Sequence, residues 1–197
     1  RAACATGQAG RATGDHAALA ARRARWTQDS SDGVVRVDYA GWRRSNPARD
    51  GLGRYIDHLS ALDPPALSRP EQFAFWANLY NALTLREVID AWPVKSIRDI
   101  RSSLLVAGPW KKIVVRVRGV DLSLDGIEHG ILRKGWSDPR VHYAVNCASF
   151  SCPNLRRQAW RGGGLGPTLD EAARAYVNHP RRVAFKGAAL TVSSIYK

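Results

Sequence analysis

Apolar residues recur with helical spacing in two stretches of the first half of the chain. The spacing over 52–62 predicts one helix. A second, longer helix is expected over 68–91, because Ser68 and Glu71 have the spacing of a capping box. Trp92-Pro93 should end it, since the residue before a proline is disfavoured in helical geometry. The first half is therefore expected to be mainly helical.

The second half adds short segments in which apolar and polar residues alternate with the period of a strand. Because helices come first and strands later, without regular alternation, the expected fold is α+β. We expect N-terminal helices packed on a mostly antiparallel sheet. The expected strands are 34–39 (or a docking segment), 141–146, and two hairpins formed by 112–117 with 120–122 and by 183–185 with 189–192; further helices are expected at 96–101, 123–133 and 168–177.

The length of the chain, 197 residues, suits a single domain. Residues 1–30 are rich in Ala, Gly, Arg and small polar residues, and only 16–25 has helical character. We therefore interpret 1–30 as a loosely ordered lead and 31–197 as one domain. The glycine-rich stretch 161–167 lacks the spacing of a phosphate-binding loop and is interpreted as a surface loop.

The charge is strongly positive, with 30 Lys and Arg against 17 Asp and Glu, a net +13. Most of these cations are arginines spread along the chain without an aromatic-basic motif, so the pattern does not favour nucleic-acid binding. A solvated basic surface that could meet an acidic protein partner is expected instead. No apolar run reaches the length of a transmembrane helix. Because the chain contains no Met, residues upstream are expected to have been removed, and Cys4 faintly resembles a bacterial lipid-anchoring cysteine.

Candidate chemistry centres on segment 142–153, with Cys147 as the candidate nucleophile and His142 as its base. A cysteine reacts as thiolate, which needs a nearby base or an electropositive setting. On an ideal strand His142 and Asn146 share one face, so the chain has to turn before Cys147 can approach the imidazole. A helix or nest beginning at Cys147 would supply amide groups for an oxyanion.

Three other interpretations of this segment stay open. Cys147 and His142 could both be ordinary core residues. Cys147 and Cys152 could form a disulfide in an exported protein. Zinc ligation by these cysteines with His129 and His142 is weaker, because the spacing matches no standard zinc pattern, so neither a metal nor a cofactor is expected.

Two further groups of residues could support such a site. Glu128 and His129 are adjacent on a predicted helix and point about 100° apart, so one of them is expected to orient the catalytic imidazole or to be that imidazole. Asn78 and Asn81 share an otherwise apolar helix face, where buried amides need partners, and we favour a structural role for them. The residues expected to bind substrate or support the site are Asn78, Asn81, Asn146, Ser149, Trp76 and Tyr80.

The same stretches, 75–82, 127–133 and 138–153, resemble the family called domain of unknown function 547. The resemblance covers about residues 36–196. It implies an exported or membrane-anchored bacterial protein. Some eukaryotic relatives carry the domain beside a coiled coil or a glutaredoxin-like domain, which suggests thiol chemistry. By resemblance, the motif positions are Asn78, Asn81, Glu128, His129, His142, Asn146, Cys147 and Cys152.

The leading functional hypothesis is a papain-like or transglutaminase-like thiol hydrolase or acyl transferase. Cys147 would attack an acyl carbon, His142 would act as base and acid, and Glu128 or His129 would orient it. The substrate would be a peptide, an isopeptide or a glutathione-like compound. The alternative is a non-catalytic binding module in which Cys147 and Cys152 form a structural turn or disulfide.

Overall fold

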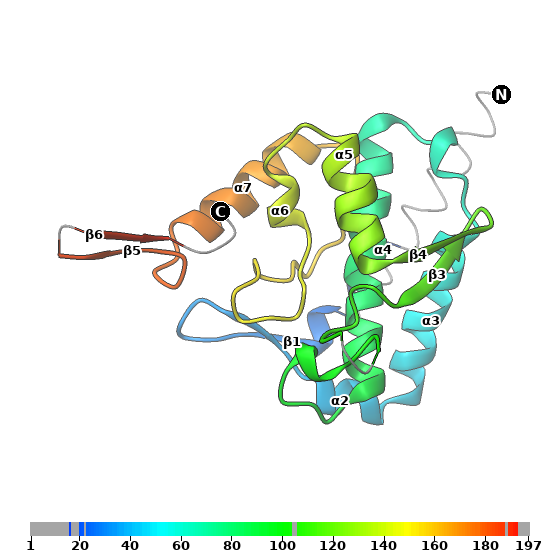
Figure 1. Cartoon of the computed structure of the whole chain (residues 1–197), viewed down its shortest axis with the longest axis horizontal. Helices are drawn as coiled ribbons and strands as arrows, with labels where there is room; N and C mark the ends of the chain where they lie inside the picture. Colours follow the sequence, from blue (N-terminus) through cyan, green and yellow to red (C-terminus); the bar gives the residue numbers. More distant parts are fainter. Residues whose placement is uncertain (1–15, 17–19, 22, 104–105, 188, 193–197) are drawn as a thin grey trace.

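The computed structural model describes residues 16, 20, 21, 23–103, 106–187 and 189–192 (Figure 1). Helices and antiparallel strands follow one another along the chain, which confirms the α+β class. The helices and helical turns are α2 (Tyr39–Arg44), α3 (Asn46–Ser60), η1 (Pro64–Ala66), α4 (Arg69–Ala91), η2 (Ile97–Asp99), η3 (Gly126–Leu132), α5 (Arg133–Gly135), α6 (Val141–Ala144) and α7 (Leu165–Val177). The strands are β1 (Thr27–Asp29), β2 (Val35–Val37), β3 (Ile113–Val117), β4 (Val120–Ser123), β5 (Val183–Lys186) and β6 (Ala189–Val192).

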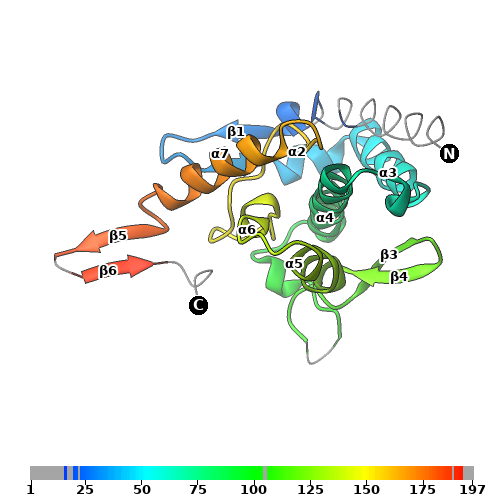
Figure 2. The same cartoon turned by 90° about the horizontal axis from the view of Figure 1, so that it is seen from above.

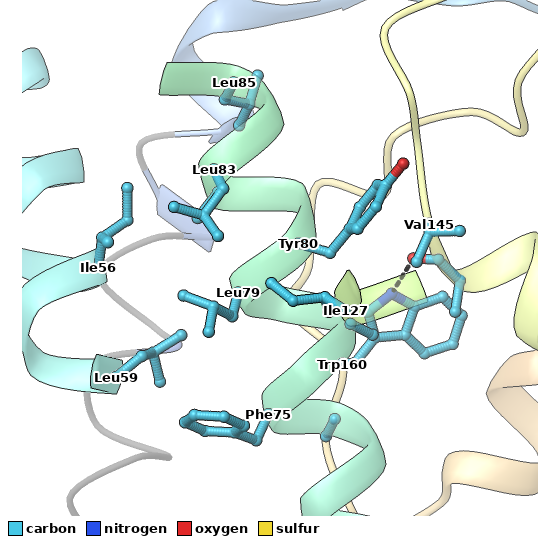
Figure 3. Packing of buried hydrophobic residues seen from close by; sticks show 14 of the residues in the cluster. Ile56, Leu59, Phe75, Leu79, Tyr80, Leu83, Leu85, Ile127, Val145 and Trp160 are labelled. Carbon is cyan, nitrogen blue, oxygen red and sulfur yellow. Dashed lines mark hydrogen bonds between the residues drawn. The ribbon is translucent and has the colours of Figure 1, made fainter. Parts of the chain in front are cut away.

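The core is built around α4, which lies in the middle of the molecule (Figure 1). This helix is apolar on nearly its whole circumference, and such a helix is stable only when other elements surround it. Leu79 and Leu83 face Ile56 and Leu59 of α3, while Ile127 and Trp160 lie on the other side of α4 (Figure 3). Of the candidate site residues, Trp76, Asn78, Tyr80 and Asn81 therefore lie on this central helix.

The ends of α4 lie where the sequence predicts them. The capping box is present, and the Ser68 N–H donates to the Glu71 carboxylate at 3.2 Å. The helix ends at Ala91, directly before Trp92-Pro93. Both hairpin predictions are confirmed as well, because β3 pairs with β4 and β5 with β6 in antiparallel register.

Within the described residues the strands form three separate two-stranded antiparallel sheets, β1-β2, β3-β4 and β5-β6. Figures 1 and 2 show the β3-β4 and β5-β6 hairpins at opposite ends of the molecule. The helices pack mainly on one another around α4, with the hairpins at the periphery. None of the described helices combines the length and apolar character that crossing a bilayer requires.

The prediction of a strand over 141–146 is wrong, because residues Val141–Ala144 form one helical turn, α6. The carboxylate of Asp138 accepts the N–H of Arg140 at 2.9 Å, and its carbonyl accepts the N–H of Val141 at 3.1 Å. These bonds close a turn that starts the helix. The chain becomes extended only at Val145.

Part of the predicted lead packs against the core. His16 is buried and its Nδ1 lies 2.7 Å from the Tyr55 hydroxyl, and Arg23 is fully buried on a helical segment. Burial lowers the pKa of Arg23 to about 10. Cys4 lies outside the described residues.

Asn78 joins α4 to the segment around Trp160. Its side chain is fully buried, its amide nitrogen donates to the Trp160 carbonyl at 2.9 Å, and its amide oxygen accepts the Trp160 N–H at 3.0 Å. One side chain thus satisfies both backbone groups of a buried residue. Backbone groups buried without a partner cost free energy, so this pairing is a strong local constraint.

Replacing Asn78 should therefore destabilise the protein. We expect Asn78→Ala to lower the free energy of unfolding by about 3 kcal/mol, because the N–H and C=O of Trp160 both lose a buried partner. Urea unfolding followed by tryptophan fluorescence measures this. The matched control is Asn178→Ala at the exposed end of α7, expected within about 0.5 kcal/mol of the parent. Equal effects for the two variants would contradict the role given to Asn78.

Candidate functional site

The segment that carries the site is held to α4 by Asn81. The amide nitrogen of Asn81 donates to the Ala144 carbonyl at 2.9 Å, and its oxygen accepts the N–H of Asn146 at 2.8 Å. The same Ala144 carbonyl accepts the indole N–H of Trp160 at 3.0 Å, shown by the dashed line in Figure 3. Asn81 therefore pairs with this extended segment as a neighbouring strand would, and it fixes the backbone directly before Cys147.

The turn after this segment is closed by Asn146. Its Nδ2 donates to the Pro153 carbonyl at 2.6 Å, and its Oδ1 accepts the Ala148 N–H at 2.8 Å. Ala148 has a positive φ of 55°, so the chain reverses sharply there instead of beginning a helix. The N–H of Cys147 donates to the sulfur of Cys152 at 3.3 Å. The amide groups expected to bind an oxyanion at 147 and 148 thus already have partners.

Cys147 and Cys152 form a disulfide, with a Cα–Cα distance of 6.1 Å. Cys147 is half-buried and lines a cavity, whereas Cys152 is buried. The loop that they close is also held by other groups. The Tyr176 hydroxyl donates to the Ser151 carbonyl at 3.1 Å, and the buried Arg182 donates to the Cys152 carbonyl at 3.1 Å and to the Phe150 carbonyl. The position of Cys147 therefore does not depend on the disulfide alone.

A cavity of about 330 Å³ lies beside Cys147. It brings together residues from α4, from the segment before β3 and from η3. Of the sequence-predicted site residues, Cys147, Glu128, His129 and Tyr80 share it. Its lining residues are Tyr80, Val106, Ala107, Trp110, Lys111, Asp125, Glu128, His129 and Cys147.

Tyr80 is the buried polar group of this cavity. The residue is fully buried, and Figure 3 shows its hydroxyl pointing away from Leu79 and Leu83. The hydroxyl lies near the Glu128 carboxylate and can donate toward it, although among the described residues it makes no hydrogen bond of normal geometry. Burial raises the pKa of Tyr80 well above its ordinary value, and the negative charge of Glu128 raises it further. The group is thus a protonated donor at any physiological pH.

Arg133 joins the two histidines of the motif. Its Nη1 lies 2.9 Å from Nδ1 of His129, and its Nη2 lies 2.8 Å from Nε2 of His142. A guanidinium can only donate, so each of these ring nitrogens accepts and each neutral imidazole carries its proton on the other nitrogen. For His129 that proton is on Nε2, which lies 3.6 Å from the carboxylate of Asp125.

His142 does not line the cavity of Cys147 in the described structure. It lines a neighbouring cavity with Arg133 and Trp136, because the helical turn α6 directs its ring toward Arg133. This arrangement differs from the predicted pairing of His142 with Cys147. Burial lowers the pKa of His142, and the positive charge of Arg133 lowers it further.

The remaining predicted residues lie outside the cavity. Trp76 packs its ring edge-on against Phe75 at 4.7 Å, and Ser149 is exposed, with its hydroxyl 3.0 Å from that of Ser151. The sequence analysis did not identify Asp125 or Arg133, although Asp125, His129 and Arg133 follow one another at intervals of four residues. Among the described residues, no cluster of His, Cys, Asp and Glu could hold a metal ion.

The family described as "Protein of unknown function, DUF547" matches residues 64–177, more than half of the chain. The matched range contains α4, η3, the Cys147–Cys152 loop and α7. In comparisons with curated proteins and with solved structures, nothing matches the chain. The papain-like or transglutaminase-like likeness therefore stays a prediction.

Removing the charge of Arg133 should raise the pKa of His142 toward its ordinary value of 6.5, because one of the causes that lower it is lost. A histidine whose pKa is lowered by folding binds protons more readily when unfolded, so stability falls as the pH drops through 6.5. This loss should be smaller in Arg133→Gln.

NMR titration of the imidazole resonances measures the shift directly. The matched control is Arg54→Gln, which removes a cation from an exposed position on α3. An unchanged His142 pKa in the Arg133 variant would show that burial alone lowers it.

Proposed function

The chain belongs to the DUF547 family, and from this premise and the cavity beside Cys147 we propose a thiol-dependent enzyme that hydrolyses or transfers acyl groups. The observation that carries the proposal is the shared cavity of Cys147, Glu128, His129 and Tyr80. Acyl transfer requires a nucleophile, a proton acceptor, a proton donor and a group that stabilises an oxyanion. These four residues can supply one each.

The roles follow from the hydrogen-bonding state of each group. The carboxylate of Glu128 is an acceptor and would take the proton of the Cys147 thiol as sulfur attacks the carbonyl carbon. His129 keeps its proton on Nε2 while Arg133 occupies Nδ1, so it would donate to the leaving group. The Tyr80 hydroxyl would stabilise the oxyanion in place of the engaged backbone amides. The sequence-based hypothesis assigned the roles of base and acid to His142. In this scheme Glu128 is the base and His129 is the acid.

The nucleophile in this scheme is the reduced form of Cys147. Cys147 is the more accessible of the two disulfide cysteines, so an external thiol would attack its sulfur and Cys152 would leave as thiolate. A second external thiol would then release Cys147 from the mixed disulfide as the free thiol. The loop contacts of Asn146, Tyr176 and Arg182 would keep Cys147 beside the cavity after reduction. A disulfide is expected in an oxidising compartment, which agrees with the proposal of an exported protein.

The disulfide also favours a second candidate, a non-catalytic binding module in which Cys147–Cys152 is purely structural. A groove of about 360 Å³ between the chain after Cys152 and α7 would be the binding surface. Its lining includes Arg156, Arg157 and Arg181 against two carboxylates, which would suit an acidic protein partner.

Acylation of Cys147 distinguishes the two candidates. Reduced protein mixed with p-nitrophenyl acetate should release a burst of p-nitrophenol and gain one acetyl group on Cys147. Cys152→Ala should give the burst without reductant, because its Cys147 cannot be held in the disulfide. Cys147→Ala should react at the rate without enzyme. Peptide mapping by mass spectrometry separates Cys147 from Cys4, and a full burst from Cys147→Ala would rule out the thiol mechanism.

Tyr80→Phe tests the oxyanion role. Acylation should slow by about 10²–10³-fold, the usual effect of losing one oxyanion donor. The free energy of unfolding should stay constant or rise, because the variant removes a buried hydroxyl that has no normal hydrogen bond. Burst kinetics and urea unfolding measure the two quantities. The matched control is Tyr39→Phe, which removes a hydroxyl from a ring stacked on Trp92 outside the cavity, and it should acylate normally. Acylation at the parent rate in Tyr80→Phe would leave the oxyanion without its proposed donor.

A further inference from the structure

Two carboxylates line the cavity without forming an ion pair to Lys or Arg among the described residues. Asp125 and Glu128 are both half-buried, and no Lys or Arg lies within ion-pair distance of either in the described part of the chain. The carboxylate of Asp125 lies 3.6 Å from Nε2 of His129. With 30 Lys and Arg against 17 Asp and Glu, partners are plentiful on this chain. Lys111 also lines the cavity, so two carboxylates there stand against one cation, and the recess is net negative in a positively charged protein.

The cavity also contains a buried hydroxyl, which lies close to the Glu128 carboxylate. The hydroxyl oxygen of Tyr80 lines it, is fully buried and makes no hydrogen bond of normal geometry with the described residues. A hydroxyl has one proton to donate and two lone pairs to accept with. Tyr80 can therefore donate to an oxyanion and accept from a cation at the same time.

These acceptors indicate which chemical class of ligand would fit the cavity. Asp125, Glu128 and Tyr80 supply three oxygens to one recess, and a primary ammonium group carries three N–H donors on a compact charge. The ring of Trp110 also lines the recess, and aromatic rings attract cations. Partly buried carboxylates are attracted to a cation more strongly than exposed ones, because water screens the charges less.

We propose that the recess binds the ammonium group of an acyl acceptor, so that the site transfers acyl groups from Cys147 to primary amines. The proposal rests on the thiol function given above and names its second substrate. The amine nitrogen attacks the thioester carbon of acylated Cys147, the C–N bond forms and the C–S bond breaks. Before the attack one proton of the ammonium passes through the Glu128 carboxylate to water, which frees the lone pair of the nitrogen. The second proton, lost once the C–N bond has formed, goes to the departing sulfur of Cys147.

The bound ammonium also affects the nucleophile. Asp125 and Glu128 disfavour a further negative charge, and a thiolate at Cys147 is such a charge. A cation in the recess would offset them. Amine binding and thiolate formation are therefore expected to support each other.

The first measurement is binding of pentylamine to the reduced protein by titration calorimetry, with 1-pentanol as the uncharged probe of equal length. Pentylamine should bind, Glu128→Gln should weaken it at least ten-fold, and pentanol should not compete. The matched control Asp57→Asn removes an exposed carboxylate from α3 and should bind like the parent. Absent binding, or equal binding of pentanol, overturns the ammonium site and leaves the thiol function untouched.

The second measurement is the fate of the acetyl group when p-nitrophenyl acetate and pentylamine are both present. Mass spectrometry should detect N-pentylacetamide in excess of acetate, with the uncatalysed reaction taken from Cys147→Ala. The ratio of amide to acetate does not depend on how fast Cys147 is acylated, and it should fall at least ten-fold in Glu128→Gln. Acylation that yields acetate alone overturns the acceptor role. Amine binding without any acylation overturns the thiol function and keeps the ammonium site.

Discussion

The pairing of two buried amides of α4 with peptide groups of the second half of the chain is the constraint on which the rest of the structure depends. Asn78 satisfies the N–H and C=O of Trp160, and Asn81 bridges Ala144 and Asn146. Both are at most 3% exposed. Because each amide offers a donor and an acceptor in fixed geometry, only one register of the second half satisfies both. The position of Cys147 along α4 is set by that register.

The same constraint explains why this protein needs no large sheet. An extended segment inside a core requires partners for its peptide groups, and a sheet usually supplies them. Here a helix supplies them through side chains, so the strands remain in small hairpins at the periphery. The loop that follows is then closed by Asn146, Tyr176 and Arg182 as well as by the disulfide.

Local signals made much of this architecture predictable. The capping box at Ser68 and the Trp92-Pro93 step define α4, and the turn residues between the paired segments define the hairpins. The segment 141–146 was wrongly predicted as a strand because the spacing of its apolar residues fits both a helix and a strand. Its actual conformation is set by the turn that Asp138 forms at its start and by the pairing of its extended end with Asn81. A tertiary contact of this kind is invisible in a pattern confined to one segment.

The candidate site shows the same division between local and tertiary information. Residue type and proximity in sequence singled out Cys147, Glu128, His129 and Tyr80, which share the cavity. Proximity in sequence also suggested His142 as the base, but only the fold shows that its ring meets Arg133 instead. Arg133 escaped notice because an arginine in a chain rich in arginines gives no signal until its two partners are known.

The charges around the cavity distinguish the proposed mechanism from that of enzymes whose cysteine is already a thiolate before substrate binds. A stable thiolate at neutral pH requires a neighbouring cation, most often an imidazolium. Arg133 donates to His142 and lowers its pKa, while the cavity beside the sulfur is lined by Asp125 and Glu128 against the one charge of Lys111. On the proposed function, Cys147 would react only when a base and a charged substrate are in place. On the proposed function, the Cys147 thiol would react slowly with most compounds and would react readily only with substrates that bring a positive charge into the cavity.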